Sequence, residues 1–144
     1  MGSQHKENYS VKHPPGTQSD PAIETALPEM VKEGRISCAA AHGLAKRLNV
    51  SPAAVGLAMD MQNFRISRCQ LGLFGHTPER RIVKAAEEIQ PREEEAVRDA
   101  LKNGRLACID AWGIAKKLSL SRMEIAGICE ALQIRISPCQ LGAF

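Results

Sequence analysis

Apolar residues recur at helical spacing along most of the chain, and Gly, Pro and Ser interrupt the pattern at regular places. The spacing predicts a first helix over residues 21–34 that ends at a glycine. It predicts a second helix over 38–48, a tight turn, and a third helix over 51–62. A short extended segment, 64–66, follows. The pattern therefore predicts a unit of three helices with one extended segment.

The same pattern returns 70 residues further along the chain. Residues 21–74 and 91–144 align without a gap, and 21 of the 54 aligned positions are identical. The agreement is densest at the end of each copy, where both read Arg-Ile-Ser-x-Cys-Gln-Leu-Gly-x-Phe. The sequence therefore predicts a tandem duplication.

The segments outside the two copies have patterns of their own. Residues 1–20 carry few apolar side chains, so they are expected to be disordered. In the joining segment, a threonine precedes a proline and an acidic residue, and apolar residues then follow at helical spacing. The predicted organisation is a disordered tail (1–20), a first module (21–74), a connecting helix (75–90) and a second module (91–144).

Composition narrows the class of protein. Only 3% of the residues are aromatic, and 19 Lys and Arg stand against 16 Asp and Glu, which gives a formal net charge of +3. The sequence has no apolar run of the roughly 20 residues that a membrane span needs, and no signal peptide. These observations predict an all-α, mostly helical protein of the cytoplasm that does not associate with membranes.

The second and third helices of each copy have the pattern of a known DNA-binding motif. Residues 44–55 and 114–125 each place a small residue, Ala45 or Ala115, where two helices cross, and then a turn, and then a serine that can cap the third helix. This pattern resembles the tandem helix-turn-helix proteins of bacteria and archaea, of the tri-helical or winged-helix-like kind. The resemblance implies two such modules in a pseudo-two-fold arrangement. We also expect the single extended segments of the two copies to pair with each other, antiparallel, as a small β ribbon.

The resemblance implies DNA binding and transcription regulation by an intramolecular pseudo-dimer. Such proteins usually lay the third helix in the major groove, but the third helices here carry few side chains that can read bases. Contacts with phosphates are therefore expected to dominate. The candidate nucleic-acid-binding residues are Lys46, Arg47, Ser51, Arg65, Arg68, Lys116, Lys117, Ser121, Arg122 and Arg135.

Two other functions stay open. The third helix of the first copy is apolar nearly all round, so a protein partner or a second copy of the chain can be expected to cover it. Four cysteines also obey the repeat, and they are either small buried side chains or a thiolate site that senses redox state or holds zinc or iron. They are Cys38, Cys69, Cys108 and Cys139.

No motif of a known catalytic centre occurs in the sequence. It contains neither a phosphate-binding glycine loop nor a His-Glu-x-x-His or Gly-x-Ser-x-Gly sequence. The sequence therefore predicts that the protein is not an enzyme and has no resident cofactor.

Overall fold

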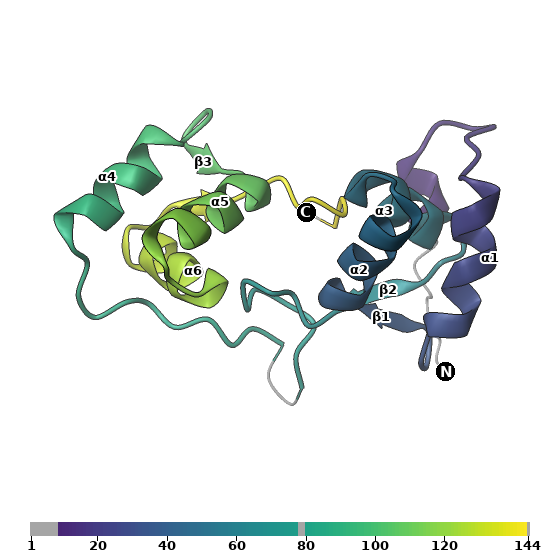
Figure 1. The fold of residues 1–144 in the computed structure, drawn as a ribbon, viewed down its shortest axis with the longest axis horizontal. Coiled ribbons are helices and arrows are strands. Elements are labelled where there is room, and N and C mark those ends of the chain that lie inside the picture. Colours follow the sequence, from purple (N-terminus) through teal and green to yellow (C-terminus); the bar gives the residue numbers. More distant parts are fainter. Residues whose placement is uncertain (1–8, 78–79, 144) are drawn as a thin grey trace. The chain divides into compact units, whose positions relative to one another are not determined.

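A computed structural model describes residues 9–77 and 80–143 (Figure 1). The chain divides into two compact units, residues 1–67 and residues 68–144. None of the helices in the described part of the chain is long and apolar enough to cross a membrane.

The first unit is built on three α-helices and a two-stranded sheet. Buried apolar side chains such as Ile23, Leu44 and Met59 form its core, and the helices pack on one another around them. Its elements in chain order are the 3-10 helix η1 (Tyr9–Lys12), α1 (Pro21–Met30), β1 (Arg35–Ser37), α2 (Cys38–Leu48), α3 (Pro52–Met61) and β2 (Arg65–Ser67).

The second unit repeats this order of elements. It contains α4 (Pro91–Asp99), β3 (Arg105–Leu106), α5 (Cys108–Leu118), α6 (Arg122–Ala131) and β4 (Arg135–Ile136). The pattern of buried and exposed residues over 31–50 is the same as that over 101–120. The predicted mostly helical fold is therefore confirmed, and the predicted bounds of α2 and α5 agree with the structure. The predicted first helix, 21–34, is too long, because α1 ends at Met30 and Gly34 lies in a tight turn instead.

Local capping explains why α2, α3 and α6 begin where they do. The Ser37 hydroxyl accepts a hydrogen bond from the Ala40 N–H at the start of α2. Ser51 and Ser121 do the same at the starts of α3 and α6. Between α2 and α3, Asn49 adopts the left-handed conformation that lets the chain turn sharply.

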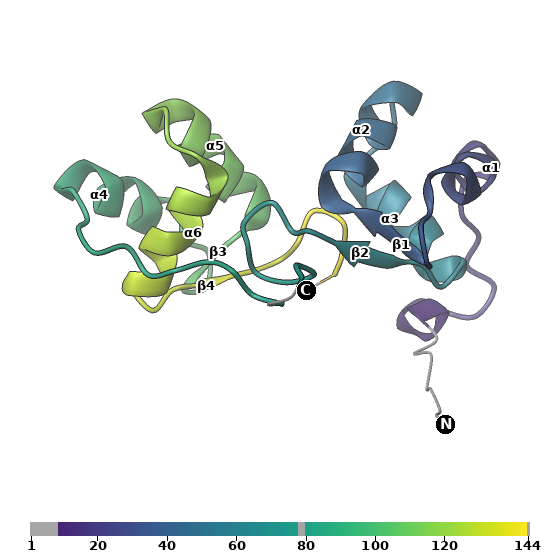
Figure 2. The ribbon, with the colours of Figure 1, turned by 90° about the horizontal axis from the view of Figure 1, so that it is seen from below.

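The extended segments pair differently from the prediction. The described part of each unit has two of them, and they are parallel: β1 pairs with β2, and β3 pairs with β4 (Figure 2). The predicted antiparallel ribbon between 65–67 and 135–137 is wrong, because both segments are already paired inside their own unit. Parallel strands need a long crossover connection, and α2 with α3, or α5 with α6, provides it.

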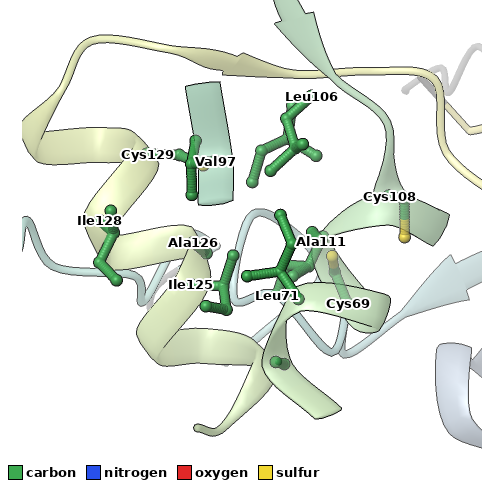
Figure 3. Close-up of a cluster of buried hydrophobic side chains, with 13 residues drawn as sticks. Cys69, Leu71, Val97, Leu106, Cys108, Ala111, Ile125, Ala126, Ile128 and Cys129 are labelled. Atoms are coloured by element: carbon green, nitrogen blue, oxygen red, sulfur yellow. The ribbon is translucent and has the colours of Figure 1, made fainter. Parts of the chain in front are cut away.

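The closing segment of the first copy, residues 68–74, belongs to the second unit. Its Cys69 and Leu71 are 5% and 0% exposed and lie in the same apolar cluster as Val97, Ile125 and Cys129 (Figure 3). The two units therefore meet at residue 67. The predicted boundary at residue 74 followed the sequence repeat, but burial of this segment assigns it to the following unit.

The connector, residues 75–90, is not the predicted helix. Its described part has no helical turn, and the start signal at residues 78–79 lies outside the described residues. The backbone N–H groups of Ile82 and Val83 donate to the Gly72 carbonyl, and that of Ala86 donates to the Gly127 carbonyl. Hydrogen bonds to other segments replace those that a helix would have made within the connector.

The tail is structured over the residues that the structure describes. Residues 9–20, predicted to be disordered, include η1, which packs on α3. The Tyr9 N–H donates to the Asn63 side chain at 3.1 Å, and Lys12 and His13 contact Asp60. Polar contacts hold this segment, which explains why its low content of apolar residues gave no sign of order.

Candidate nucleic-acid interface

A tight turn and the two-stranded sheet bring basic side chains together in the first unit. Glu33 and Gly34 both have positive φ angles, of 52° and 75°, as the two central residues of a type I′ turn require. This turn sets Lys32 opposite Arg35. The parallel register then places Arg35 directly beside Arg65. Because neighbouring strands lie about 4.8 Å apart, the two arginine side chains start from adjacent positions on the same face of the sheet.

The second unit builds the same arrangement. Asn103 and Gly104 form the turn, with φ angles of 53° and 76°, and Lys102 lies opposite Arg105. Arg105 is then in register with Arg135. We call Arg35 with Arg65, and Arg105 with Arg135, the arginine pairs.

Both arginine pairs face solvent. All four residues are exposed, while the next residues along, Ile36 and Leu106, are 2% and 0% exposed on the opposite face of their strands. None of the four guanidinium groups forms an ion pair with a carboxylate among the described residues. Like charges directly opposite each other destabilise a strand pair, so each pair is a place where an anion would relieve repulsion.

The lysines next to the arginine pairs differ between the units. In the second unit, the Lys102 ammonium lies 3.6 Å from a carboxylate oxygen of Asp110. The residue at the equivalent position of the first unit is Ala40, and Lys32 has no ion pair with a described carboxylate. Each unit therefore has one acidic residue near its arginine pair, Glu33 in the turn of the first unit and Asp110 beside Lys102 in the second.

The other basic candidates lie at the far ends of α2 and α5. These helices lead away from the sheet (Figure 2), and 11 residues at about 1.5 Å each place the two ends of one helix roughly 15 Å apart. All four of these residues are exposed, and they sit in the last turn, where cations suit the helix dipole. They are Lys46, Arg47, Lys116 and Lys117.

The remaining candidates have different surroundings. Arg68 is exposed in the closing segment. Ser51 and Ser121 are exposed, and their hydroxyl oxygens accept from the third helices. Arg122 is half-buried, with its guanidinium carbon 3.6 Å from the centre of the Trp112 ring. Only Arg65 and Arg135 of the predicted set belong to the arginine pairs.

Sequence reasoning missed Arg35 and Arg105, the other halves of the pairs. Both are among the identical positions of the repeat, as Arg65 and Arg135 are. That identity was the available signal. The sequence alone did not show that the two arginines of each pair, which are separated in the chain by two helices, lie side by side in a parallel sheet.

The third helices are covered in both units. In α3 the Asp60 carboxylate, 9% exposed, accepts from the Lys12 ammonium at 3.2 Å and lies 2.9 Å from Nε2 of His13. In α6 the residue at the equivalent position, Glu130, forms an ion pair with Arg81 of the connector. The same position of the repeat thus holds the segment that leads into each unit against its third helix.

This cover weighs against reading bases with the third helices. The backbone of the connector passes so close to α6 that a Cβ at Gly127 would lie 2.7 Å from the Lys84 carbonyl oxygen. The residues of α6 that remain exposed are Glu124 and Glu130, which are acidic and would repel phosphates. The apolar third helix that was expected to bind a partner is itself largely buried, with Val55, Ala58 and Met59 among its buried residues.

The repeated cysteines do not form a metal centre among the described residues. No group of three or more His, Cys, Asp or Glu side chains there is arranged to hold a metal ion, and the cysteines are not joined in disulfides. Cys38, Cys69 and Cys108 are buried, and Cys139 is half-buried. Burial raises the pKa of the Cys69 thiol, and the nearby Cys139 adds to the effect. A raised pKa disfavours the thiolate that a metal or an oxidant needs.

No family model, curated protein or solved structure matches this chain.

Proposed function

We propose that the protein binds double-stranded DNA through contacts with the phosphate backbone, and that it acts as a transcription regulator with two helix-turn-helix modules. The observation that carries the proposal is the presence of an exposed, uncompensated arginine pair in each unit. Two guanidinium groups side by side match the oxygens of a phosphate, which they can bind with paired hydrogen bonds.

The lysines and arginine at the ends of α2 and α5 add positive charge to the same modules. Backbone contacts of this kind position a protein on DNA without reading its sequence. Two such modules on one chain also raise the local concentration of the second once the first has bound. The proposal therefore assigns affinity to the arginine pairs and gives the third helices a structural role.

Fluorescence anisotropy with a labelled duplex of mixed sequence, about 25 base pairs long, tests the proposal. We expect binding at low salt that weakens steeply as salt rises, because each neutralised phosphate releases bound cations. Replacing one pair, as in Arg35→Ala with Arg65→Ala, should weaken binding and lower the slope of log K against log salt by about 2, roughly 1 for each arginine. Arg105→Ala with Arg135→Ala should have a similar effect.

The control is a variant that loses the same amount of positive charge as the pair variants. Arg92→Ala with Arg98→Ala removes two exposed arginines of the second unit that lie outside the pairs. It should leave the slope nearly unchanged. Absence of binding at low salt, or an equal loss in the control variant, would contradict the proposal.

A further inference from the structure

The second unit contains a shallow pocket of about 720 Å³ beside the start of α6. One wall is the Trp112 ring with Arg122, and another is apolar, formed by Leu120 and Met123. Gln70, from the closing segment of the first copy, and Lys116, from α5, complete the main side-chain lining. The pocket is thus assembled from both copies of the repeat, within one unit.

Arg122 is held in a defined orientation in this pocket. Its guanidinium carbon lies 3.6 Å from the centre of the Trp112 ring, a stacked geometry that is favourable for a cation on an aromatic face. Its Nη1 donates a hydrogen bond to the Gln70 side-chain oxygen. A guanidinium has five N–H donors, so the rest remain for a ligand or water. Because the group is already oriented, binding an anion costs little side-chain entropy.

Gln70 can orient Arg122 because its own segment is anchored. The neighbours of Gln70, Cys69 and Leu71, are 5% and 0% exposed. The Cys69 N–H donates to the Phe74 carbonyl, and the Gly72 N–H donates back to the Cys69 carbonyl. The closing segment is therefore a folded support for the pocket.

The pocket is positively charged and has apolar walls. Neither Lys116 nor Arg122 forms an ion pair with a carboxylate among the described residues, and no Asp or Glu lines the pocket. Lys116 and Ser121 are exposed at its rim, so a solute can reach them. A few convergent polar groups on an otherwise apolar surface are typical of small-molecule sites.

The first unit lacks the residues that make this pocket. His42 and Pro52 stand at the positions of Trp112 and Arg122. Proline supplies neither a cation nor a donor at that point. Lys46 keeps the identity of its counterpart, Lys116, as do Gly43, Ala45 and Ser51. The two copies have therefore diverged at Trp112 and Arg122, while the lysine of the pocket and the arginine pairs are the same in both.

We propose that this pocket binds a small organic anion. Arg122 takes its carboxylate or phosphate group with paired hydrogen bonds, Lys116 adds a second positive charge, and Leu120 and Met123 pack against its apolar body. The site is separate from the arginine pairs, so its occupancy supplies a way for a metabolite to act on the second unit. A DNA phosphate offers the same anionic chemistry without the apolar body, and the test below distinguishes the two.

Trp112 is the single tryptophan of the chain, so its fluorescence reports directly on the pocket. The probes are phenyl phosphate, benzoate and inorganic phosphate, each titrated into the full chain at constant ionic strength. We expect a saturable change with phenyl phosphate or benzoate, and at least tenfold weaker binding of inorganic phosphate, which lacks the apolar body. Equal binding of all three, or no saturable change with any of them, would overturn the proposal.

Variants locate the signal. Lys116→Ala should weaken binding of the organic probe several-fold, and Lys46→Ala, at the same position of the first unit, should leave it unchanged. Arg122→Gln should abolish binding of the probe. A second measurement, independent of fluorescence, is the unfolding temperature, which the probe should raise in the wild type and leave unchanged in Arg122→Gln. Gln70→Ala keeps both cations and should weaken binding by loosening Arg122. Binding that survives in Arg122→Gln and Lys116→Ala alike would overturn the site.

A short DNA duplex provides the last arm. If the duplex changes Trp112 fluorescence in the wild type but not in Arg122→Gln, and no organic probe binds, the pocket is a contact for the DNA backbone and the small-anion proposal is wrong. Failure of this proposal leaves the DNA proposal standing, because the latter is measured by anisotropy on variants of the arginine pairs.

Discussion

For the cysteines, recurrence in the repeat and burial in the structure give different information about the role of each residue. Four of them recur at equivalent positions, a pattern that fits either buried side chains or a thiolate site. Cys129 has no cysteine counterpart; Met59 occupies the equivalent position, and both are 1% exposed. Burial, and then the adjacent Glu130 carboxylate, raise the pKa of the Cys129 thiol to about 11. At this residue a sulfur atom serves packing.

The pKa of Cys129 predicts a loss of stability at high pH. The folded state keeps the thiol proton more tightly than the unfolded chain, whose thiol has the ordinary value of 9.0. The free energy of unfolding should therefore be unaffected by this group below pH 9 and should fall as pH rises from 9 toward 11. We expect a loss on the order of 1 kcal/mol by pH 10.

Urea unfolding of the wild type and of Cys129→Ala at pH 8 and pH 10 measures this effect. All other titrating groups are shared, so the difference between the two proteins isolates Cys129. The wild type should lose more stability than the variant over this interval. Parallel losses in the two proteins would show that the thiol ionises as easily in the folded state as in the unfolded one.

At the scale of elements, the segments leading into each unit decide what the third helices can do. Their sequences predicted disorder for one and a helix for the other, because local signals were the only guide. In the structure, η1 and the connector both pack on a third helix, and an acidic residue of that helix contacts each of them. The connector is irregular and not helical because its backbone forms hydrogen bonds with residues distant in the sequence.

Gly127 allows the connector to approach α6, and its substitution tests that cover. A Cβ there would lie 2.7 Å from the Lys84 carbonyl oxygen, which belongs to backbone. Gly127→Ala should displace the connector and break the hydrogen bond from the Ala86 N–H to the Gly127 carbonyl. We expect a net destabilisation of about 1–3 kcal/mol, with faster proteolysis in residues 80–89.

Gly113→Ala is the matched control. Gly113 is also within a helix of the second unit, and a Cβ there would meet no atom within 4 Å. The better helix propensity of alanine should therefore stabilise the protein by about 0.5–1 kcal/mol. Circular dichroism during urea unfolding and limited proteolysis measure both variants. Equal stabilisation of the two would mean that the connector does not lie against α6.

At the scale of the whole molecule, the boundary of the repeat and the boundary of the folded unit are different. The repeat closes at residue 74, but the second unit begins at residue 68. A duplicated sequence shows where the two copies align. It does not show in which folded unit a given segment is buried. Leu71 shows this directly, because it belongs to the first copy of the repeat but is fully buried among residues of α4, α5 and α6.

Leu71→Ala tests the boundary in the intact chain. It should lower the stability of the second unit by about 2–4 kcal/mol, because it leaves a cavity in the core. The unfolding transition is followed by the fluorescence of Trp112, which belongs to that unit. Leu73→Ala, at a half-buried position of the same segment, should have a smaller effect. A Trp112 transition unchanged by Leu71→Ala would place the closing segment outside the second unit.

The sequence by itself determined the duplication, the mostly helical fold, the bounds of α2 and α5, and the serine caps of α3 and α6. These depend on spacing and capping within a few residues, which the chain shows directly. Only the tertiary structure decided that Arg35 lies beside Arg65, that the closing segment completes the next unit, and that the third helices are covered. Each of these joins segments far apart in the chain, where packing and hydrogen bonding outweigh local preference.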